Sequence, residues 1–198
     1  YYFARDVKGT SIDKLTDAII KTGKSKYIYS FAREVKGASI NKLTYAIIEI
    51  GEAGYMYLFA RDFKNSPIDK LTDAIIKTGN AEYIYYFGKN NDVKGTLIDK
   101  LTDAIIEIGE AEYIYSFAKD YEIKGTSINK LTDAIIEVGE AEYIYLFARD
   151  VKGAPVDKLT DAIIKTGNKE LIKKFKEDIL VINDIDNDQD ITMNNLLK

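Results

Sequence analysis

The chain has 198 residues, of which 46% are hydrophobic and 30% are charged, and its formal net charge at pH 7 is -4. This composition is ordinary for a folded protein, and the acidic balance argues against a general nucleic-acid binder, which usually carries a basic face. The sequence contains no cysteine and no histidine. Disulfides, thiolate metal sites, a cysteine nucleophile and a histidine general base are therefore excluded.

No apolar run approaches the ~20 residues that cross a bilayer, so we expect no membrane association and a cytoplasmic location. The chain begins at Tyr1 without Met, inside a repeat. We therefore expect that N-terminal residues of a longer protein are missing.

Internal repetition dominates the chain, which contains two alternating stretches. One is Tyr-Ile-Tyr-x-Phe-Ala-Arg, centred on Phe31, Phe59, Phe87, Phe117 and Phe147. The other is Lys-Leu-Thr-Asp-Ala-Ile-Ile, which occurs six times from Lys14 onwards, with Tyr45 in place of Asp in the second copy. Successive Phe residues are 28 or 30 positions apart. Such a period is typical of tandem-repeat architectures.

The first stretch of each unit predicts a helix. Ile28, Phe31, Ala32 and Val35 fall at positions i, i+3, i+4 and i+7, which is one apolar helical stripe. We expect Gly37 and its equivalents to end this helix in the left-handed conformation, with Asn65 taking that role in the third unit.

The second stretch predicts another helix, with Ile12, Leu15 and Ile19 on its apolar stripe. Ser66 is the expected capping residue before Pro67 at the first helical position. Thr10 and Thr96 resemble the first residues of capping boxes. In the fourth and fifth units the Phe-to-Leu spacing grows from 12 to 14 residues, and we expect the two additional residues to lie in a surface loop.

Two helices of roughly 11 residues per unit are marginal alone and become stable by stacking. The sequence therefore predicts an all-α fold, a right-handed α-α superhelix (solenoid) of six to seven two-helix repeats. The segment IIEVGEAEYIYLFA (residues 135–148) resembles the helix–turn–helix core of short HEAT-like repeats. This resemblance of pattern extends over about residues 1–175, and no specific family is identified by it.

Residues 1–168 are expected to form six repeats. The residue before each Phe runs Tyr2, Ser30, Leu58 and then again Tyr86, Ser116, Leu146, which indicates that a three-unit block, about 1–84, was duplicated as 85–168. Residues 169–182 are expected to form a C-terminal capping helix with a polar outer face. Residues 183–198 form a polar tail rich in Asp and Asn.

Three kinds of residue recur in columns along such an array. The paired tyrosines, such as Tyr27 and Tyr29, are expected to pack between units, although an aromatic ladder for a ligand is an alternative. The Lys and Thr of each second stretch are the candidate ligand-binding residues, and the acids beside each Lys favour a self-neutralised face instead. These candidates are Lys14, Thr16, Lys42, Thr44, Lys70, Thr72, Lys100, Thr102, Lys130, Thr132, Lys158 and Thr160.

The tail offers the one pattern that resembles a metal site. Asp184, Asp186, Asp188 and Asp190 alternate as in an EF-hand loop, but Gln189 stands where Gly is needed for the turn. They are a weak calcium candidate, and a solvated acidic tail is the favoured interpretation. No catalytic constellation is present, so we expect neither an enzyme nor a cofactor.

We therefore expect a non-enzymatic scaffold that binds a protein or peptide along its concave surface. A structural array that associates end to end is the alternative. Nucleic-acid binding through Tyr and Lys columns is a weaker one, because the Lys column is flanked by acids.

Overall fold

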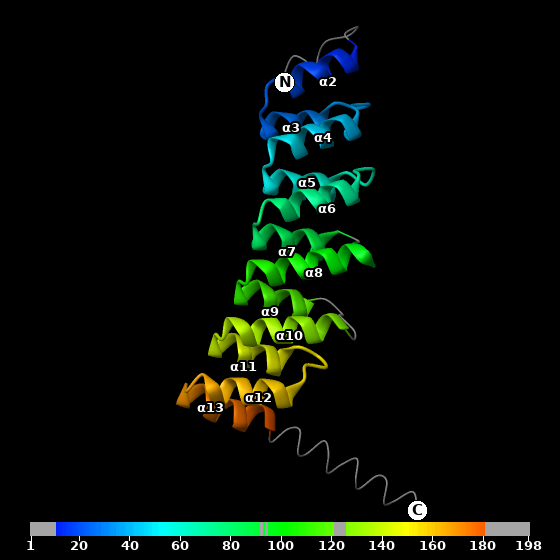
Figure 1. Ribbon diagram of the computed structural model, residues 1–198. Helices are drawn as coiled ribbons and strands as arrows, with labels where there is room; N and C mark the ends of the chain where they lie inside the picture. The colour runs from blue at the N-terminus through cyan, green and yellow to red at the C-terminus, as the bar shows by residue number, and fades with distance from the viewer. Residues whose placement is uncertain (1–10, 92, 94, 121–125, 181–198) are drawn as a thin grey trace, which may run out of the picture. The chain divides into compact units, whose positions relative to one another are not determined.

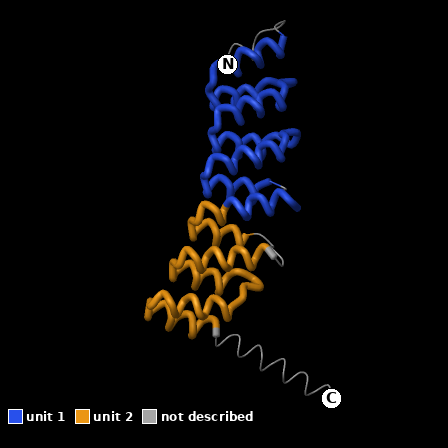
Figure 2. The backbone as a smooth tube through the Cα atoms, viewed as in Figure 1, with its two compact units in different colours: residues 1–104 blue, residues 105–198 orange. Residues whose placement is uncertain are grey.

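The structure is a computed structural model that describes residues 11–91, 93, 95–120 and 126–180. Over these residues the chain is all-α, with twelve α-helices, α2 to α13, and no strand (Figure 1). The chain divides into two compact units, residues 1–104 and residues 105–198 (Figure 2).

The helices of the first unit follow the predicted alternation. The Lys-Leu-Thr stretches form α2 (Ile12–Ile20), α4 (Ile40–Ile50), α6 (Ile68–Lys77) and α8 (Thr96–Ile108), the last of which extends into the second unit. The Tyr-Ile-Tyr stretches form α3 (Ser25–Glu34), α5 (Ala53–Asp62) and α7 (Ala81–Asn90). Two short helices per repeat, predicted from the apolar periodicity, are confirmed.

The second unit continues the same order. Its helices are α9 (Ala111–Asp120), α10 (Thr126–Val138), α11 (Ala141–Asp150), α12 (Val156–Lys165) and α13 (Lys169–Phe175). A single π-helical segment, Lys176–Leu180, follows α13 where a continuous capping helix was expected. Asn168 caps α13, since its side-chain oxygen accepts a hydrogen bond from the Leu171 N–H at 3.1 Å.

Within each unit a helix contacts its neighbour in the chain and also the next helix but one. In the first unit α4 contacts α3 and α5, and also α2 and α6. In the second unit α11 contacts α12 and α10, and also α9 and α13. The even-numbered helices thus form one layer of each unit and the odd-numbered helices form the other, as Figure 1 shows.

The core lies between these two layers. Each repeat from the second to the sixth contributes one buried Phe from its odd-numbered helix and one buried Leu from its even-numbered helix, and α13 adds a further buried Phe. The buried Phe residues, each at most 1% exposed, are Phe31, Phe59, Phe87, Phe117, Phe147 and Phe175. The buried Leu residues, each 0% exposed, are Leu43, Leu71, Leu101, Leu131 and Leu159. Fully burying an apolar side chain of this size contributes about 1.5–3 kcal/mol, so these residues stabilise the stack.

The two additional residues of the fourth and fifth repeats lie in helices, contrary to the expectation of a longer loop. Five residues, 35–39, separate α3 from α4, and five residues, 91–95, also separate α7 from α8. The helix α8 instead begins five residues before Leu101, whereas α4 begins three residues before Leu43. Once a helix is nucleated, each further residue adds a hydrogen bond, so lengthening the helix is favourable.

The odd-numbered helices do not end as predicted. The helix α3 ends at Glu34, and Gly37 lies further on, in a turn in which the Ala38 N–H donates to the Val35 carbonyl at 3.1 Å. The φ angle of Gly37 is 87°, which is the left-handed conformation. This conformation is needed for the turn and not for the end of the helix. Asn65 does not substitute for it, because every described residue with positive φ is a glycine.

The predicted N-caps also differ. Pro67 itself precedes α6, and the Ser66 hydroxyl donates to the Phe59 carbonyl at 3.0 Å, so Ser66 ties the turn to α5 rather than capping α6. Thr96 is the first residue of α8, not a residue preceding it. Thr10 lies outside the described residues.

Candidate functional site

A ladder of ion pairs joins successive even-numbered helices, which carry the predicted Lys and Thr candidates. The Nζ of Lys42 on α4 lies 3.0 Å from Oδ1 of Asp17 on α2. The same atoms of Lys158 and Asp133 are 2.8 Å apart between α12 and α10. In both pairs the Lys contacts the Asp of the preceding repeat, whereas the sequence spacing favours the Lys of the same helix as that Asp.

The ladder continues between Lys100 on α8 and Asp73 on α6, whose Nζ and Oδ1 atoms are 2.6 Å apart. The hydrogen bond from Lys100 lowers the pKa of the Asp73 carboxyl, and the positive charges of Lys70 and Lys77 lower it further. These pairs are exposed on both sides. Each therefore adds little stability alone, but each pair neutralises one Lys and one Asp on this layer.

One position breaks the ladder. The residue of α4 that corresponds to Asp17 is Tyr45, so Lys70 on α6 faces a phenol where Lys42 faces a carboxylate. Among the described residues, Lys70 makes no hydrogen bond and no ion pair within 4.0 Å. Its ammonium group is available on the surface.

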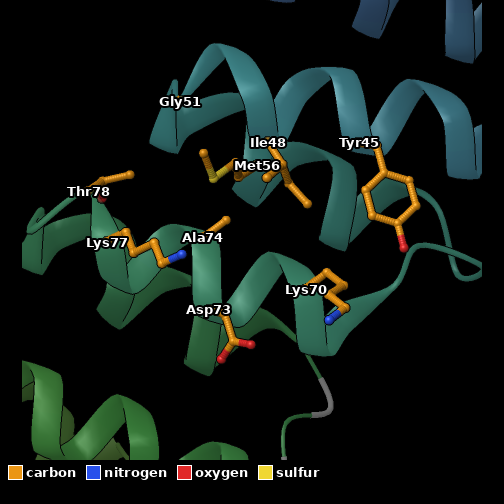
Figure 3. Close-up of a pocket in the computed structure, with 9 residues that line it drawn as sticks. All are labelled: Tyr45, Ile48, Gly51, Met56, Lys70, Asp73, Ala74, Lys77 and Thr78. Carbon is orange, nitrogen blue, oxygen red and sulfur yellow. The ribbon is translucent and has the colours of Figure 1, made fainter.

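An open groove lies at this break, over α4, the start of α5, and α6. Its volume is about 460 Å³. Figure 3 shows Tyr45 and Lys70 at one end of the groove and Lys77 toward the other, with Ile48 and Met56 between them. The lining residues are Tyr45, Ile48, Gly51, Met56, Lys70, Asp73, Ala74, Lys77 and Thr78.

Two lining residues depart from the repeat. Tyr45 is 49% exposed, although it is a large aromatic side chain. Met56, which is 1% exposed at the floor, stands where the other Tyr-Ile-Tyr stretches have Ile. Met adapts its shape more readily than Ile because it is unbranched and has more rotatable bonds. The groove therefore combines an exposed ring, an adaptable floor and two ammonium groups.

The Thr residues of the even-numbered helices do not present their hydroxyls to a ligand in this structure. Each hydroxyl donates to the carbonyl four residues earlier in its own helix, at 2.8–2.9 Å. Five of the six side chains are buried and Thr160 is half-buried. This back-bonding uses each Thr hydroxyl within its own helix. The remaining candidates, Lys14 and Lys130, are exposed on α2 and α10.

A second set of contacts, between odd-numbered helices, was not predicted from the sequence. The second Tyr of a pair donates its hydroxyl to an acid of the next repeat. Tyr29 on α3 bonds Asp62 on α5, Tyr115 on α9 bonds Asp150 on α11, and Tyr145 bonds Asp178 beyond α13. We call these three contacts the Tyr–Asp clamps. The second Tyr of each clamp is buried or half-buried between repeats, as the packing interpretation expects, whereas Tyr27, the first Tyr of its pair, is 43% exposed.

Cations complete the clamps. At Asp150 the Arg149 Nε donates to Oδ1 at 2.6 Å, and the Lys119 Nζ donates to Oδ2 at 3.0 Å. The Arg149 hydrogen bond, followed by those from Tyr115 and Lys119, lowers the pKa of the Asp150 carboxyl far below its usual range. Burial and the hydrogen bond to Asp150 raise the pKa of Tyr115. The clamp therefore holds an ionised carboxylate beside a neutral phenol.

The clamp between α5 and α7 is altered. The corresponding residue there is Asn90, whose amide donates to the Tyr86 carbonyl of its own helix at 3.0 Å. Tyr57 instead lies against Tyr83, with ring centroids 6.5 Å apart, and Arg61 lies 5.4 Å from the centre of the Tyr57 ring. Both departures from the repeated contacts, Tyr45 and Asn90, thus involve the repeat formed by α5 and α6.

Within residues 11–180, as far as they are described, no group of three or more acidic side chains could hold a metal ion. The calcium candidates Asp184, Asp186, Asp188 and Asp190 lie outside the described residues. None of the described helices has both the length and the apolar character needed to span a membrane.

Compared with protein-family models, with curated proteins and with solved structures, the chain shows no match to any of them.

Proposed function

We propose that this chain is a non-enzymatic repeat scaffold, a right-handed α-solenoid, that binds a protein or peptide along the surface of its even-numbered helices. The observation that carries this proposal is the groove over α4 to α6, which is open, about 460 Å³ in volume and lined by apolar and cationic side chains. Recognition sites of this kind offer apolar contact area with a few polar groups that fix orientation.

The charges on the rest of this layer support the same location. At Asp17, Asp73 and Asp133 the carboxylates are already paired with Lys residues of the next repeat. A partner that paired with those lysines would have to displace an existing contact. At the groove, by contrast, Tyr45 and Lys70 are accessible without that cost.

The absence of catalysis is part of the proposal. Active sites commonly shift the pKa of an acid or base toward the working pH. In the described residues the lowered pKa values of Asp62, Asp73 and Asp150 arise from direct hydrogen bonds to Arg or Lys. Such acids stay ionised at neutral pH and hold helices together, so they are poor proton donors or acceptors.

Affinity capture with matched variants tests the binding function. In the Ile48→Arg variant, a bulky cation enters the groove from α4, whereas Ile136→Arg makes the same change at the equivalent position of α10. Wild type and Ile136→Arg should retain the same protein from a cell lysate, and Ile48→Arg should lose it. Quantitative mass spectrometry measures this difference.

Other results of that experiment would favour the other functions. Recovery of nuclease-sensitive material by all three proteins would favour nucleic-acid binding. Recovery of the bait alone, with light scattering that grows with protein concentration, would favour a self-assembling array. Equal capture by Ile48→Arg and wild type would remove the groove from the proposal.

A further inference from the structure

The repeats provide an internal comparison for the groove. In three places an even-numbered helix presents a Lys whose Nζ lies 2.6–3.0 Å from a carboxylate of the preceding even-numbered helix. The backbone and the neighbouring core are repeated at Lys70, where Leu71 and Leu43 are 0% exposed, as are Leu101, Leu131 and Leu159. Only the carboxylate is missing, because Tyr45 replaces it.

We propose that the groove binds a peptide segment of a partner protein through an Asp or Glu side chain, whose carboxylate pairs with Lys70. This inference rests on the proposed peptide-binding function and specifies its chemistry. The partner's carboxylate takes the place that Asp17, Asp73 and Asp133 occupy in the ladder.

The local charge favours an acidic partner. The chain carries a net charge of -4, yet the titratable groups that line the groove are Lys70, Lys77, Asp73 and Tyr45. Asp73 is already paired with Lys100 at 2.6 Å. Two ammonium groups therefore line the groove, and the carboxylate among the lining residues is paired with a third ammonium group, that of Lys100. Opposite charge on a ligand is attracted to such a site.

The apolar lining of the groove indicates which kind of residue adjoins the Asp or Glu in the bound peptide. Ile48, Met56 and Ala74 lie along the groove between Lys70 and Lys77 (Figure 3). The exposed Tyr45 ring lies at the Lys70 end. A peptide whose carboxylate reaches Lys70 would place its neighbouring side chains over this surface. We therefore infer that an apolar or aromatic residue adjoins the Asp or Glu.

A peptide array tests the inference directly. The array carries decapeptides with randomised flanks in matched pairs, one member with a central Glu and the other with Gln. We expect the bound set to be enriched in pairs with an apolar or aromatic neighbour. In these pairs the Gln member should bind roughly three- to tenfold more weakly, since a carboxylate–ammonium contact is lost.

Three variants connect binding to Lys70. Lys70→Gln removes the ammonium group. Tyr45→Asp restores the carboxylate that the other repeats carry and so satisfies Lys70 from within the chain. Lys158→Gln is the control, because Lys158 is the equivalent residue on α12 and is already paired with Asp133. Lys70→Gln and Tyr45→Asp should both abolish the preference for Glu over Gln, and Lys158→Gln should preserve it.

Circular dichroism and thermal melting establish that each variant is folded, and the exposure of the exchanged side chains makes unfolding unexpected. If peptides bind through the groove but Glu and Gln members bind equally, the acidic specificity is wrong and the scaffold function stands. If the Tyr45→Asp variant keeps the Glu preference, Lys70 is not the recognising residue. If no peptide binds at all, the proposed peptide binding fails together with this inference.

Discussion

At the scale of single residues, the Tyr–Asp clamps are the contacts in which the most chemistry is concentrated. Asp150 accepts hydrogen bonds from Tyr115, Arg149 and Lys119, and its side chain is only 15% exposed. A hydrogen bond to a charged group is worth more than one between neutral groups, and removing one partner leaves the other poorly solvated. The clamps should therefore make a measurable contribution to stability.

Replacing Tyr115 by Phe deletes one hydroxyl and keeps the ring. We expect the free energy of unfolding to fall by about 1 kcal/mol, at the lower end for such hydrogen bonds because Tyr115 is half-buried. Urea denaturation followed by circular dichroism measures it. Tyr143→Phe is the control, since among the described residues that hydroxyl makes no hydrogen bond. An equal loss in both variants would mean that the clamp bond contributes nothing.

The clamps also predict how stability depends on pH. The folded chain lowers the pKa of Asp150, so the unfolded chain binds the proton more readily. The stabilisation is thus complete above the unfolded pKa of about 3.9 and is lost as the pH falls further. Melting temperatures between pH 5 and pH 2 should fall less steeply for Asp150→Asn than for wild type, from a lower starting value. Parallel curves would contradict the assigned role.

At the scale of helices, the apolar periodicity predicted the helices and their buried faces, but it did not predict which side chains contact one another. The stripe through Ile28, Phe31 and Ala32 correctly predicted a helix and its buried face, because burial depends on one helix and its own period. The partner of Tyr115 could not be predicted in the same way, because it is 35 residues away and depends on how two helices pack. A usable signal was present, namely the recurring Phe-Ala-Arg-Asp at 59–62 and 147–150.

The groove could be predicted only in part. The exchange of Asp for Tyr45 was visible in the sequence, but its meaning depends on which Lys it faces. Sequence spacing placed Lys14 near Asp17, three residues away on the same helix, whereas the structure pairs Asp17 with Lys42. Long side chains reach across a helix interface as readily as along a helix, so spacing alone favoured the wrong partner.

Helix ends provide a separate prediction. Gly51 follows α4 with φ of 84°, and a Cβ there would meet no atom within 4 Å. Gly51→Ala should therefore lower the free energy of unfolding by about 1–2 kcal/mol through backbone conformation alone. Gly51→Asn should lower the free energy of unfolding by less, because Asn tolerates the left-handed region. Chemical denaturation of both variants measures the difference, and equal losses would show that φ is not the cause.

At the scale of the whole molecule, contacts between helices are short-range in sequence. Within each unit the main contacts of an α-helix are with α-helices no more than two places away in the chain order, and α11 also contacts the π-helical segment after α13. Stability in such arrays is approximately a sum over repeats and their interfaces. Along the chain, the boundary between the compact units falls between residues 104 and 105, whereas the boundary between the duplicated blocks expected from the sequence falls near residue 84. The first boundary reflects how compactly the residues are packed, and the second reflects which parts of the sequence are similar.

Local damage should therefore remain local. Phe31→Ala removes a side chain that is 1% exposed in the first unit, and a buried Phe-to-Ala change costs about 3–5 kcal/mol. Hydrogen exchange measured by mass spectrometry should accelerate in peptides from α2 to α5 and stay close to wild type in α11 and α12. The reverse pattern is expected for Phe147→Ala. Uniform acceleration along the chain would indicate a single cooperative unit instead.

The Tyr–Asp clamps also bear on how the chain could grow. A single helix supplies both halves of the contact: α11 offers the Asp150 carboxylate to α9 and the Tyr145 hydroxyl to the segment after α13. A newly copied repeat would thus arrive with a donor for one neighbour and an acceptor for the other. Duplication of one repeat in the gene, or its deliberate insertion, would therefore recreate a Tyr–Asp clamp with each neighbouring repeat without any compensating mutation.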